Sequence, residues 1–178
     1  MSSVKLNKMI EKLQLVNLVP EVSTDEIEIS SPEINRPALQ LAGYFEHFAS
    51  ERVQIIGYVE YTYLKSLDKD VKLANYEQFL SSDIPCVIYS TRTEPDEDMI
   101  ELAKKYHKPL LSSHRITSDL MAEVIRWLGV ELAPCISIHG VLMDVYGEGI
   151  LIMGESGIGK SEAALELIKR GHRLITDD

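Results

Sequence analysis

The sequence predicts an α/β fold in two parts: an N-terminal α/β layer domain with a mostly parallel sheet over residues 1–130, and a smaller α/β unit over residues 131–178. Two observations support this division. Short apolar segments rich in Val, Ile and Leu alternate with amphipathic segments of helical period, which is the order typical of parallel strands covered by helices. A stretch with Gly129 and Pro134 then breaks the pattern and precedes a long β-prone run and a glycine-rich loop.

Local patterns of apolar residues predict the first helices and strands. Residues 6–18 place their leucines near one face of a helix that Pro20 stops, and residues 24–29 alternate like a strand. Pro37 marks the entry of a helix over residues 38–42, because its missing N–H is harmless in a first turn. Three apolar strands then alternate with four helices: strands over 53–57, 85–90 and 108–112, and helices over 58–67, 73–80, 99–106 and 117–128.

Helix starts in this region carry capping signals. The acidic run Asp96-Glu97-Asp98 suits the positive end of the helix dipole, and Thr117-Ser118-Asp119 is expected to cap the helix that follows. The turn Ser112-Ser113-His114-Arg115 before that helix has two interpretations, an anion-binding turn or simply a connection. The sequence alone leaves both open.

Composition narrows the class of protein. With 178 residues, of which 45% are hydrophobic, the chain can bury packed cores. No apolar run approaches the roughly 18 residues of a membrane span, and Met1–Lys5 leads into a charged amphipathic segment rather than a signal peptide, so cytoplasmic residence is expected. Cys86 and Cys135 lie in apolar surroundings and are expected to be buried thiols in a reducing compartment. The net charge of -10 argues against a nucleic-acid partner.

The second part begins with a β-prone run over residues 136–146, which includes His139. Gly147-Glu148-Gly149 predicts a three-residue hairpin connection into a strand over residues 149–153. An amphipathic helix over residues 163–168 follows the glycine-rich loop and is expected to end in a left-handed turn at Gly171. A last strand over residues 173–176 leads to Asp177 and Asp178.

The glycine-rich loop fits the phosphate-binding pattern G-x-x-x-x-G-K-[ST] at every fixed position. Its residues are Gly154, Glu155, Ser156, Gly157, Ile158, Gly159, Lys160 and Ser161. Glycines permit backbone conformations in which consecutive N–H groups turn inward to form an anion nest, and the following helix start adds further N–H donors. Lys160 is expected to reach the β- and γ-phosphates of ATP, and the Ser161 hydroxyl to ligate Mg²⁺.

Other interpretations of the loop are weaker. A plain turn between a strand and a helix would match the four fixed positions by chance in well under ~5% of chains of this length. A dinucleotide fingerprint starting at Gly157 would need a small residue where Glu162 stands. Acidic residues at the end of a strand, here Asp177 and Asp178, either hold Mg²⁺ or accept a proton from an attacking hydroxyl. The remaining histidines show no metal-like spacing.

Several motifs together resemble the bifunctional HPr kinase/phosphorylase family, bacterial enzymes that phosphorylate a serine of the phosphocarrier protein HPr in the sugar phosphotransferase system. The matching residues are Ser137-Ile138-His139-Gly140, the loop Gly154–Glu162, Arg170-Gly171-His172 and Asp177-Asp178, with Ile34-Asn35-Arg36-Pro37 in the first domain. The resemblance implies a kinase domain in the second part, with His139, Lys160 and Asp178 as catalytic residues and Ser161 as a Mg²⁺ ligand. Asp177 is expected to be a supporting neighbour.

The same resemblance implies partners and a second reaction. Asp178 takes the proton from the HPr serine during phosphorylation, and in the reverse reaction inorganic phosphate attacks phosphoserine and yields pyrophosphate. Members of the family form hexamers and continue well over a hundred residues past the position of Asp178, so this chain is expected to be a fragment without kinase activity of its own. Two alternatives remain: a phosphate-loop kinase with another acceptor, and a regulatory module that binds a nucleotide or another ligand.

Overall fold

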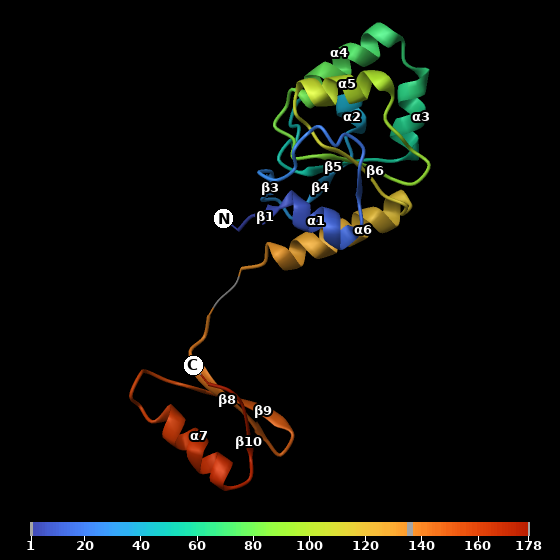
Figure 1. The fold of residues 1–178 in the computed structure, drawn as a ribbon. Coiled ribbons are helices and arrows are strands. Elements are labelled where there is room, and N and C mark those ends of the chain that lie inside the picture. The colour runs from blue at the N-terminus through green and yellow to red at the C-terminus, as the bar shows by residue number, and fades with distance from the viewer. Residues whose placement is uncertain (1, 135–136, 178) are drawn as a thin grey trace. The chain divides into compact units, whose positions relative to one another are not determined.

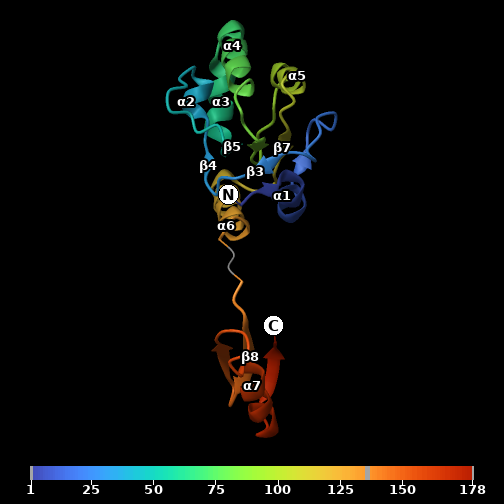
Figure 2. The same cartoon turned by 90° about the vertical axis from the view of Figure 1, so that its left-hand side faces the viewer.

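The computed structural model describes residues 2–134 and 137–177. The chain divides into two compact units, residues 1–134 and residues 135–178 (Figures 1 and 2), and each is described by itself. Each unit has its own buried apolar residues. The described part of the chain contains no helix with both the length and the apolar character of a membrane span.

A five-stranded sheet in the order β2-β7-β6-β5-β4 forms the centre of the first unit. Strands β4, β5, β6 and β7 are parallel and β2 is antiparallel at one edge, which confirms the mostly parallel sheet. A separate antiparallel pair joins β1 to β3. The bounds are β1 Val4–Lys5, β2 Val16–Asn17, β3 Glu28–Ile29, β4 Ile34–Asn35, β5 Val53–Ile56, β6 Val87–Tyr89 and β7 Leu110–Ser112.

Helices cover both faces of this sheet. Helices α1 (Leu6–Leu13) and α6 (Thr117–Glu131) lie on one face, and the other four lie on the opposite side (Figure 1). These four are α2 Ala38–Leu41, α3 Tyr58–Ser66, α4 Lys69–Leu80 and α5 Glu97–Lys105. Because side chains alternate along a strand, Ile55 and Ile88 enter the core under α1 and α6, whereas Ile56 and Val87 enter the other core.

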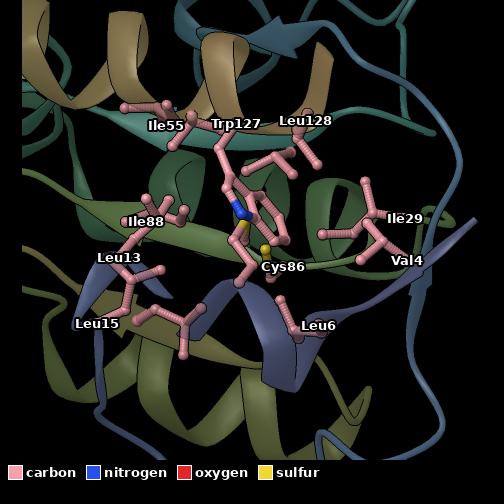
Figure 3. Packing of buried hydrophobic residues seen from close by; sticks show 14 of the residues in the cluster. Val4, Leu6, Leu13, Leu15, Ile29, Ile55, Cys86, Ile88, Trp127 and Leu128 are labelled. Carbon is pink, nitrogen blue, oxygen red and sulfur yellow. The ribbon is translucent and has the colours of Figure 1, made fainter. Parts of the chain in front are cut away.

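The core under α1 and α6 is built around the single tryptophan. Trp127 packs with leucines from α1 and with Ile55 and Ile88 of the sheet (Figure 3). Cys86 is fully buried in the same core, as expected from its apolar neighbours, and burial raises the pKa of its thiol to about 12. The expectation for Cys135 lies outside the described residues.

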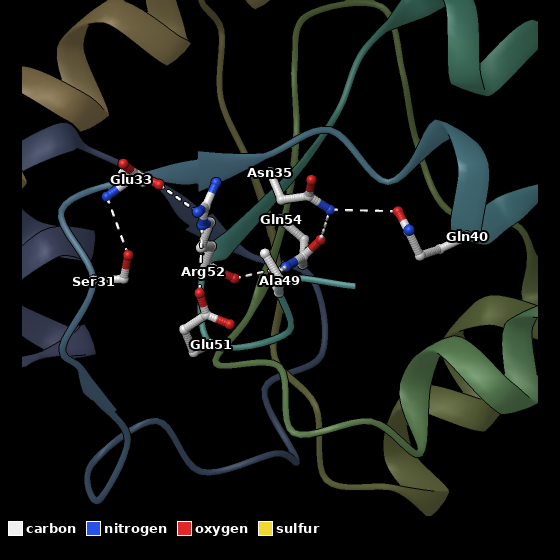
Figure 4. A network of polar contacts seen from close by, with 8 residues as sticks. All are labelled: Ser31, Glu33, Asn35, Gln40, Ala49, Glu51, Arg52 and Gln54. Carbon is white, nitrogen blue, oxygen red and sulfur yellow. Dashed lines mark hydrogen bonds and ion pairs between the residues drawn. The ribbon is translucent and has the colours of Figure 1, made fainter. Parts of the chain in front are cut away.

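Polar contacts hold the edge of the sheet at β4 and β5. Gln54 is fully buried, and its amide oxygen accepts a hydrogen bond from Asn35 Nδ2 at 2.8 Å (Figure 4). Its amide nitrogen donates to the carbonyl oxygens of Arg52 at 2.7 Å and Ala49 at 3.2 Å. This strand therefore tolerates a buried amide because its donors and its acceptor all find partners.

The first helix is shorter than predicted. It ends at Leu13, where Gln14 adopts a left-handed conformation with φ of 54°, and the N–H of Leu15 closes the turn on the carbonyl of Ile10 at 2.9 Å. Residues 16–17 form β2 instead, so Pro20 does not end the helix. The strand expected over residues 24–29 is also shorter and covers only Glu28–Ile29.

Two predictions about α6 were wrong. Gly129 does not break the helix, which continues to Glu131, and the N-cap residue is Ile116 rather than one of the three polar residues after it. Packing explains the first result. Trp127 and Leu128 of α6, and Leu132 directly after it, are buried, and their burial outweighs the roughly 1 kcal/mol that a glycine costs inside a helix. By contrast, Asp96 caps α5 as the acidic run suggested, accepting from the Met99 N–H at 3.0 Å.

The second unit is a three-stranded antiparallel sheet with one helix. Its strands β8 (Gly140–Val145), β9 (Glu148–Met153) and β10 (Arg173–Thr176) lie in the order β10-β8-β9, and helix α7 spans Lys160–Lys169. Val141, Met143 and Ala164 are its buried core. As predicted, α7 ends in a left-handed Gly171, with φ of 92°.

The hairpin between β8 and β9 corrects another prediction. The connection is the two residues Tyr146 and Gly147, because Glu148 already pairs with Val145. Both connecting residues have positive φ, 57° and 86°, as a type I′ turn requires. The side chain of Asp144 supports the turn by accepting from the Gly147 N–H at 2.8 Å.

Candidate phosphate-binding site

The glycine loop joins the end of β9 to the start of α7, and its glycines have conformations that other residues avoid. Gly157 and Gly159 have φ of 83° and 103°, and Gly159 is the left-handed N-cap residue of α7. At Gly154 a Cβ atom would lie 2.8 Å from Ile158 Cγ2. The loop can therefore close on itself only with glycine at these positions.

Lys160 is the first residue of α7, and its side chain folds back over the loop. Its Nζ donates to the carbonyl oxygen of Gly154 at 3.0 Å and to that of Glu155 at 3.3 Å. The ammonium group thus lies at the mouth of the loop. Phosphate oxygens are stronger acceptors for an ammonium group than peptide carbonyls, so an anion in the loop can take over these bonds.

Ser161 follows as the second residue of α7 and is exposed. A hydroxyl at this point can supply one oxygen ligand to Mg²⁺, an ion that keeps several waters and takes its other ligands from phosphates. Among residues 2–134 and 137–177, no group of three or more His, Cys, Asp or Glu side chains could hold a metal ion. The residues present fit a metal bound mainly through a nucleotide.

The sheet brings three other segments to the same edge. Strand β8 runs antiparallel to both neighbours, so its first residues lie beside the last residues of β9 and β10. Gly140 pairs with Met153, directly before the loop, and Leu142 pairs with Thr176, directly before Asp177. The carboxyl ends of β9 and β10 and the segment entering β8 therefore meet where the loop begins.

His139 lies immediately before β8 rather than on the strand, which corrects the sequence-based expectation. It remains at the edge occupied by the loop, and it is exposed. Glycine is needed at position 140, since a Cβ atom there would come within 2.8 Å of the Ile152 carbonyl oxygen on β9. Asp177 is also exposed at this edge, whereas Asp178 lies outside the described residues.

Sequence reasoning missed a second concave surface, which lies in the first unit. A cavity of about 540 Å³ is lined by Tyr58, Thr91, Arg92, His114, Ile116 and Thr117. Of these residues the sequence had singled out His114 as part of a turn and Thr117 as a cap. The sequence does contain a pattern that could have predicted the cavity, because two polar segments directly follow two buried parallel strands.

Comparison with known sequences assigns both units. Residues 4–128 match the HPr serine kinase N terminus, and residues 130–178 match the HPr serine kinase C-terminal domain. The chain is 57% identical over 178 residues to the HPr kinase/phosphorylase of Lachnoclostridium phytofermentans, covering all of this chain and 58% of that protein. It is 47% identical to the protein of the same name from Alkaliphilus metalliredigens, covering all of this chain and 57% of the relative.

A solved structure of the CBS and DRTGG domains of a Clostridium perfringens pyrophosphatase is 15% identical and covers 68% of this chain and 45% of its own, with a TM-score of 0.42, too low to show a common fold. The chain spans just over half the length of the curated relatives it matches. Both sequence matches together cover nearly the whole chain. The chain therefore belongs to the HPr serine kinase family.

Proposed function

We propose that the protein containing these residues is an ATP-dependent kinase that phosphorylates a serine of the phosphocarrier protein HPr. The observation that carries this proposal is the phosphate loop itself, with Lys160 folded over the loop carbonyls at the start of α7. The relatives of this chain are named HPr kinase/phosphorylase, which supports HPr as the acceptor. Localisation in the cytoplasm and assembly as a hexamer belong to the same proposal and rest on the family resemblance.

The backbone N–H groups of the loop bind the phosphate chain, and Lys160 shifts from the carbonyls of Gly154 and Glu155 to the β- and γ-phosphates. Ser161 holds Mg²⁺, which neutralises charge on the phosphates when it is bound. We take His139, which lies directly before β8 at the same edge, as a further catalytic residue.

Asp178 serves as the base in the proposed reaction. The serine oxygen of HPr attacks the γ-phosphorus while the bond to the β-phosphate oxygen breaks, and Asp178 takes the serine proton. In the reverse reaction an oxygen of inorganic phosphate attacks the phosphorus of phosphoserine while the bond from that phosphorus to the serine oxygen breaks, which yields pyrophosphate, and Asp178 returns the proton to the serine oxygen. Asp177 supports it from the position directly after β10.

Nucleotide binding by the loop can be tested on the 178-residue chain. We expect Lys160→Ala to weaken ATP binding by about tenfold or more in calorimetric titration with Mg²⁺, because charge-assisted hydrogen bonds to the phosphates are lost. Lys169→Ala is a matched control, since Lys169 lies on the same helix with a largely exposed side chain that, among the described residues, forms an ion pair only with Glu166 at 3.9 Å. Equal losses of ATP affinity in both variants, or no loss in Lys160→Ala, would show that the loop does not bind ATP.

The transfer reaction is tested on the full-length parent with HPr. Asp178→Asn is expected to lower both directions by about 10²–10⁴-fold, the usual scale of general acid–base catalysis, with ATP binding retained. Undiminished activity would exclude Asp178 as the base. The 178-residue chain alone is expected not to turn over, and turnover like that of the parent would show that these residues suffice.

A second candidate function is a regulatory module that binds its ligand in the first unit. The cavity beside Arg92 and His114 favours this alternative. In that case Lys160→Ala leaves nucleotide binding by the chain unchanged.

A further inference from the structure

The cavity of the first unit lies where parallel-sheet proteins hold their ligands. Strands β5, β6 and β7 are parallel neighbours, and each is followed at its carboxyl end by residues that line the cavity. Tyr58 follows β5, Thr91 and Arg92 follow β6, and His114 follows β7. The carboxyl edge of such a sheet is the usual place for a crevice that receives a ligand.

Hydrogen bonds join the two loops that carry Arg92 and His114. Thr91 N–H donates to the Arg115 carbonyl at 2.8 Å, and Ser113 N–H donates to the Tyr89 carbonyl at 2.9 Å. A third bond at 2.9 Å joins the hydroxyls of Ser90 and Thr117. These bonds hold Arg92 and His114 on adjacent loops at the mouth of one cavity before any ligand arrives.

Arg92 and His114 differ from the neighbouring arginines, whose side chains form structural contacts. Arg115 donates to the Leu13 carbonyl and pairs with Glu123, and Arg36 pairs with Glu60. Arg92 and His114 are exposed, and within the part of the chain that the structure describes neither makes a hydrogen bond or ion pair. The unpaired Arg92 guanidinium, beside an imidazole that can donate an N–H, favours an anionic ligand at this point in a chain of net charge -10.

Hydroxyl groups add donors. Of the two hydroxyl protons of Ser90 and Thr117, one is used in their mutual hydrogen bond, so one remains for a third group. The guanidinium of Arg92 presents a planar fork of N–H donors that fits a phosphate or carboxylate bidentately. An anion with three terminal oxygens uses more of these donors than a carboxylate with two.

The remaining wall is apolar and belongs to Tyr58 and Ile116, both of which are exposed. Gly57 keeps this wall close to α6, because a Cβ atom there would lie 2.7 Å from Thr117 Oγ1. An exposed aromatic ring beside the unpaired Arg92 guanidinium suits a ligand with a flat body and a charged end. We propose that this cavity binds a small phosphate monoester, with its phosphate between Arg92 and His114 and its apolar body against Tyr58 and Ile116.

The test uses phenyl phosphate as probe and the 178-residue chain with Lys160→Ala, which removes binding at the phosphate loop. The readout is the side-chain NMR signal of His114, assigned with a His114→Gln variant. We expect a saturable shift, with phenyl phosphate about threefold or more tighter than methyl phosphate, since only the phenyl ring buries apolar surface on Tyr58.

Arg92→Gln in the same background should weaken phenyl phosphate binding by about tenfold or more, because a charge-assisted pair is lost. The control Arg126→Gln removes an equal charge from an exposed residue of α6 that does not line the cavity, and should change binding by less than about twofold. The absence of a saturable His114 shift up to about 10 mM probe would overturn the proposal. Equal binding by the Arg92→Gln variant and its parent would do the same.

Discussion

Removing the buried carboxylate of Glu60 should destabilise the first unit much more than removing an exposed carboxylate. It is 3% exposed on α3, and its Oε2 accepts the Gly57 N–H at 3.0 Å at the start of the helix. Arg36 Nη2 lies 2.7 Å from the same carboxylate. Gly57 has no side chain that could cap the helix, and the Glu60 carboxylate is the acceptor of its N–H.

Glu60→Ala leaves the Gly57 N–H without its acceptor and the Arg36 guanidinium without its partner. The unsatisfied buried N–H costs about 1–3 kcal/mol. The side chain of Arg36 is 38% exposed and can be hydrated, so its loss adds only about 1 kcal/mol. The expected total is about 2–4 kcal/mol, whereas Glu60→Gln keeps an acceptor for Gly57 and should lose about half of that.

Urea unfolding followed by Trp127 fluorescence measures this effect, because the single tryptophan lies on the buried face of α6 and reports on the first unit. Glu77→Gln is the control, since Glu77 pairs with Lys105 at 2.6 Å with both side chains more than half exposed. This exposed pair is screened by solvent, so Glu77→Gln should cost much less than Glu60→Ala. A Glu60→Ala loss no larger than that of Glu77→Gln would refute the reasoning.

Three further predictions concern single positions. Asp96→Ala should destabilise the first unit by about 1–2 kcal/mol in the same urea assay, because the α5 cap on the Met99 N–H and the pair with Lys72 at 2.5 Å are both lost; unchanged stability would argue against the cap. Gly147→Ala should weaken the second unit by about 1 kcal/mol, seen as faster hydrogen exchange in β8 and β9, since alanine is strained at a φ of 86°; slower exchange would contradict this. Burial raises the pKa of the Cys86 thiol from 9.0 to about 12, so the thiol ionises at lower pH in the unfolded chain than in the folded chain. The contribution of Cys86 to the free energy of unfolding is therefore fully present below pH 9 and should fall as pH rises above it. The loss attributable to Cys86 at about pH 10.5 is about 2 kcal/mol, and Cys86→Ala should show a correspondingly smaller drop in urea midpoint than the parent.

The order of elements was predictable because the buried strands have distinctive compositions. Val53–Ile56 and Val87–Tyr89 are fully buried segments with β-branched residues, and such runs indicate the centre of a parallel sheet. The position of the glycine-rich loop between a strand and a helix was predictable too, because its glycines have the positive φ that the sequence pattern requires, whereas phosphate binding by the loop stays a prediction.

Long-range pairing limits what the sequence can show at the edges. Residues 16–17 continue a helical pattern locally, yet they pair with Leu111 and Ser112, which lie far along the chain. The hydrogen bonds of that pairing and the burial of Leu15 decide against the helix. The cavity at Arg92 was hidden for the same reason, since its walls come from segments after three different strands.

The outer strands of the small sheet set a practical limit on handling the 178-residue chain. Within the described residues β9 and β10 are each paired on one side only, and Ile150, Leu151, Met153 and Ile175 are exposed along them. Unpaired apolar edges of this kind recruit further strands from other molecules. Concentrated samples of this chain are therefore prone to self-association and precipitation, and a lysine placed at Leu151 should improve their solubility.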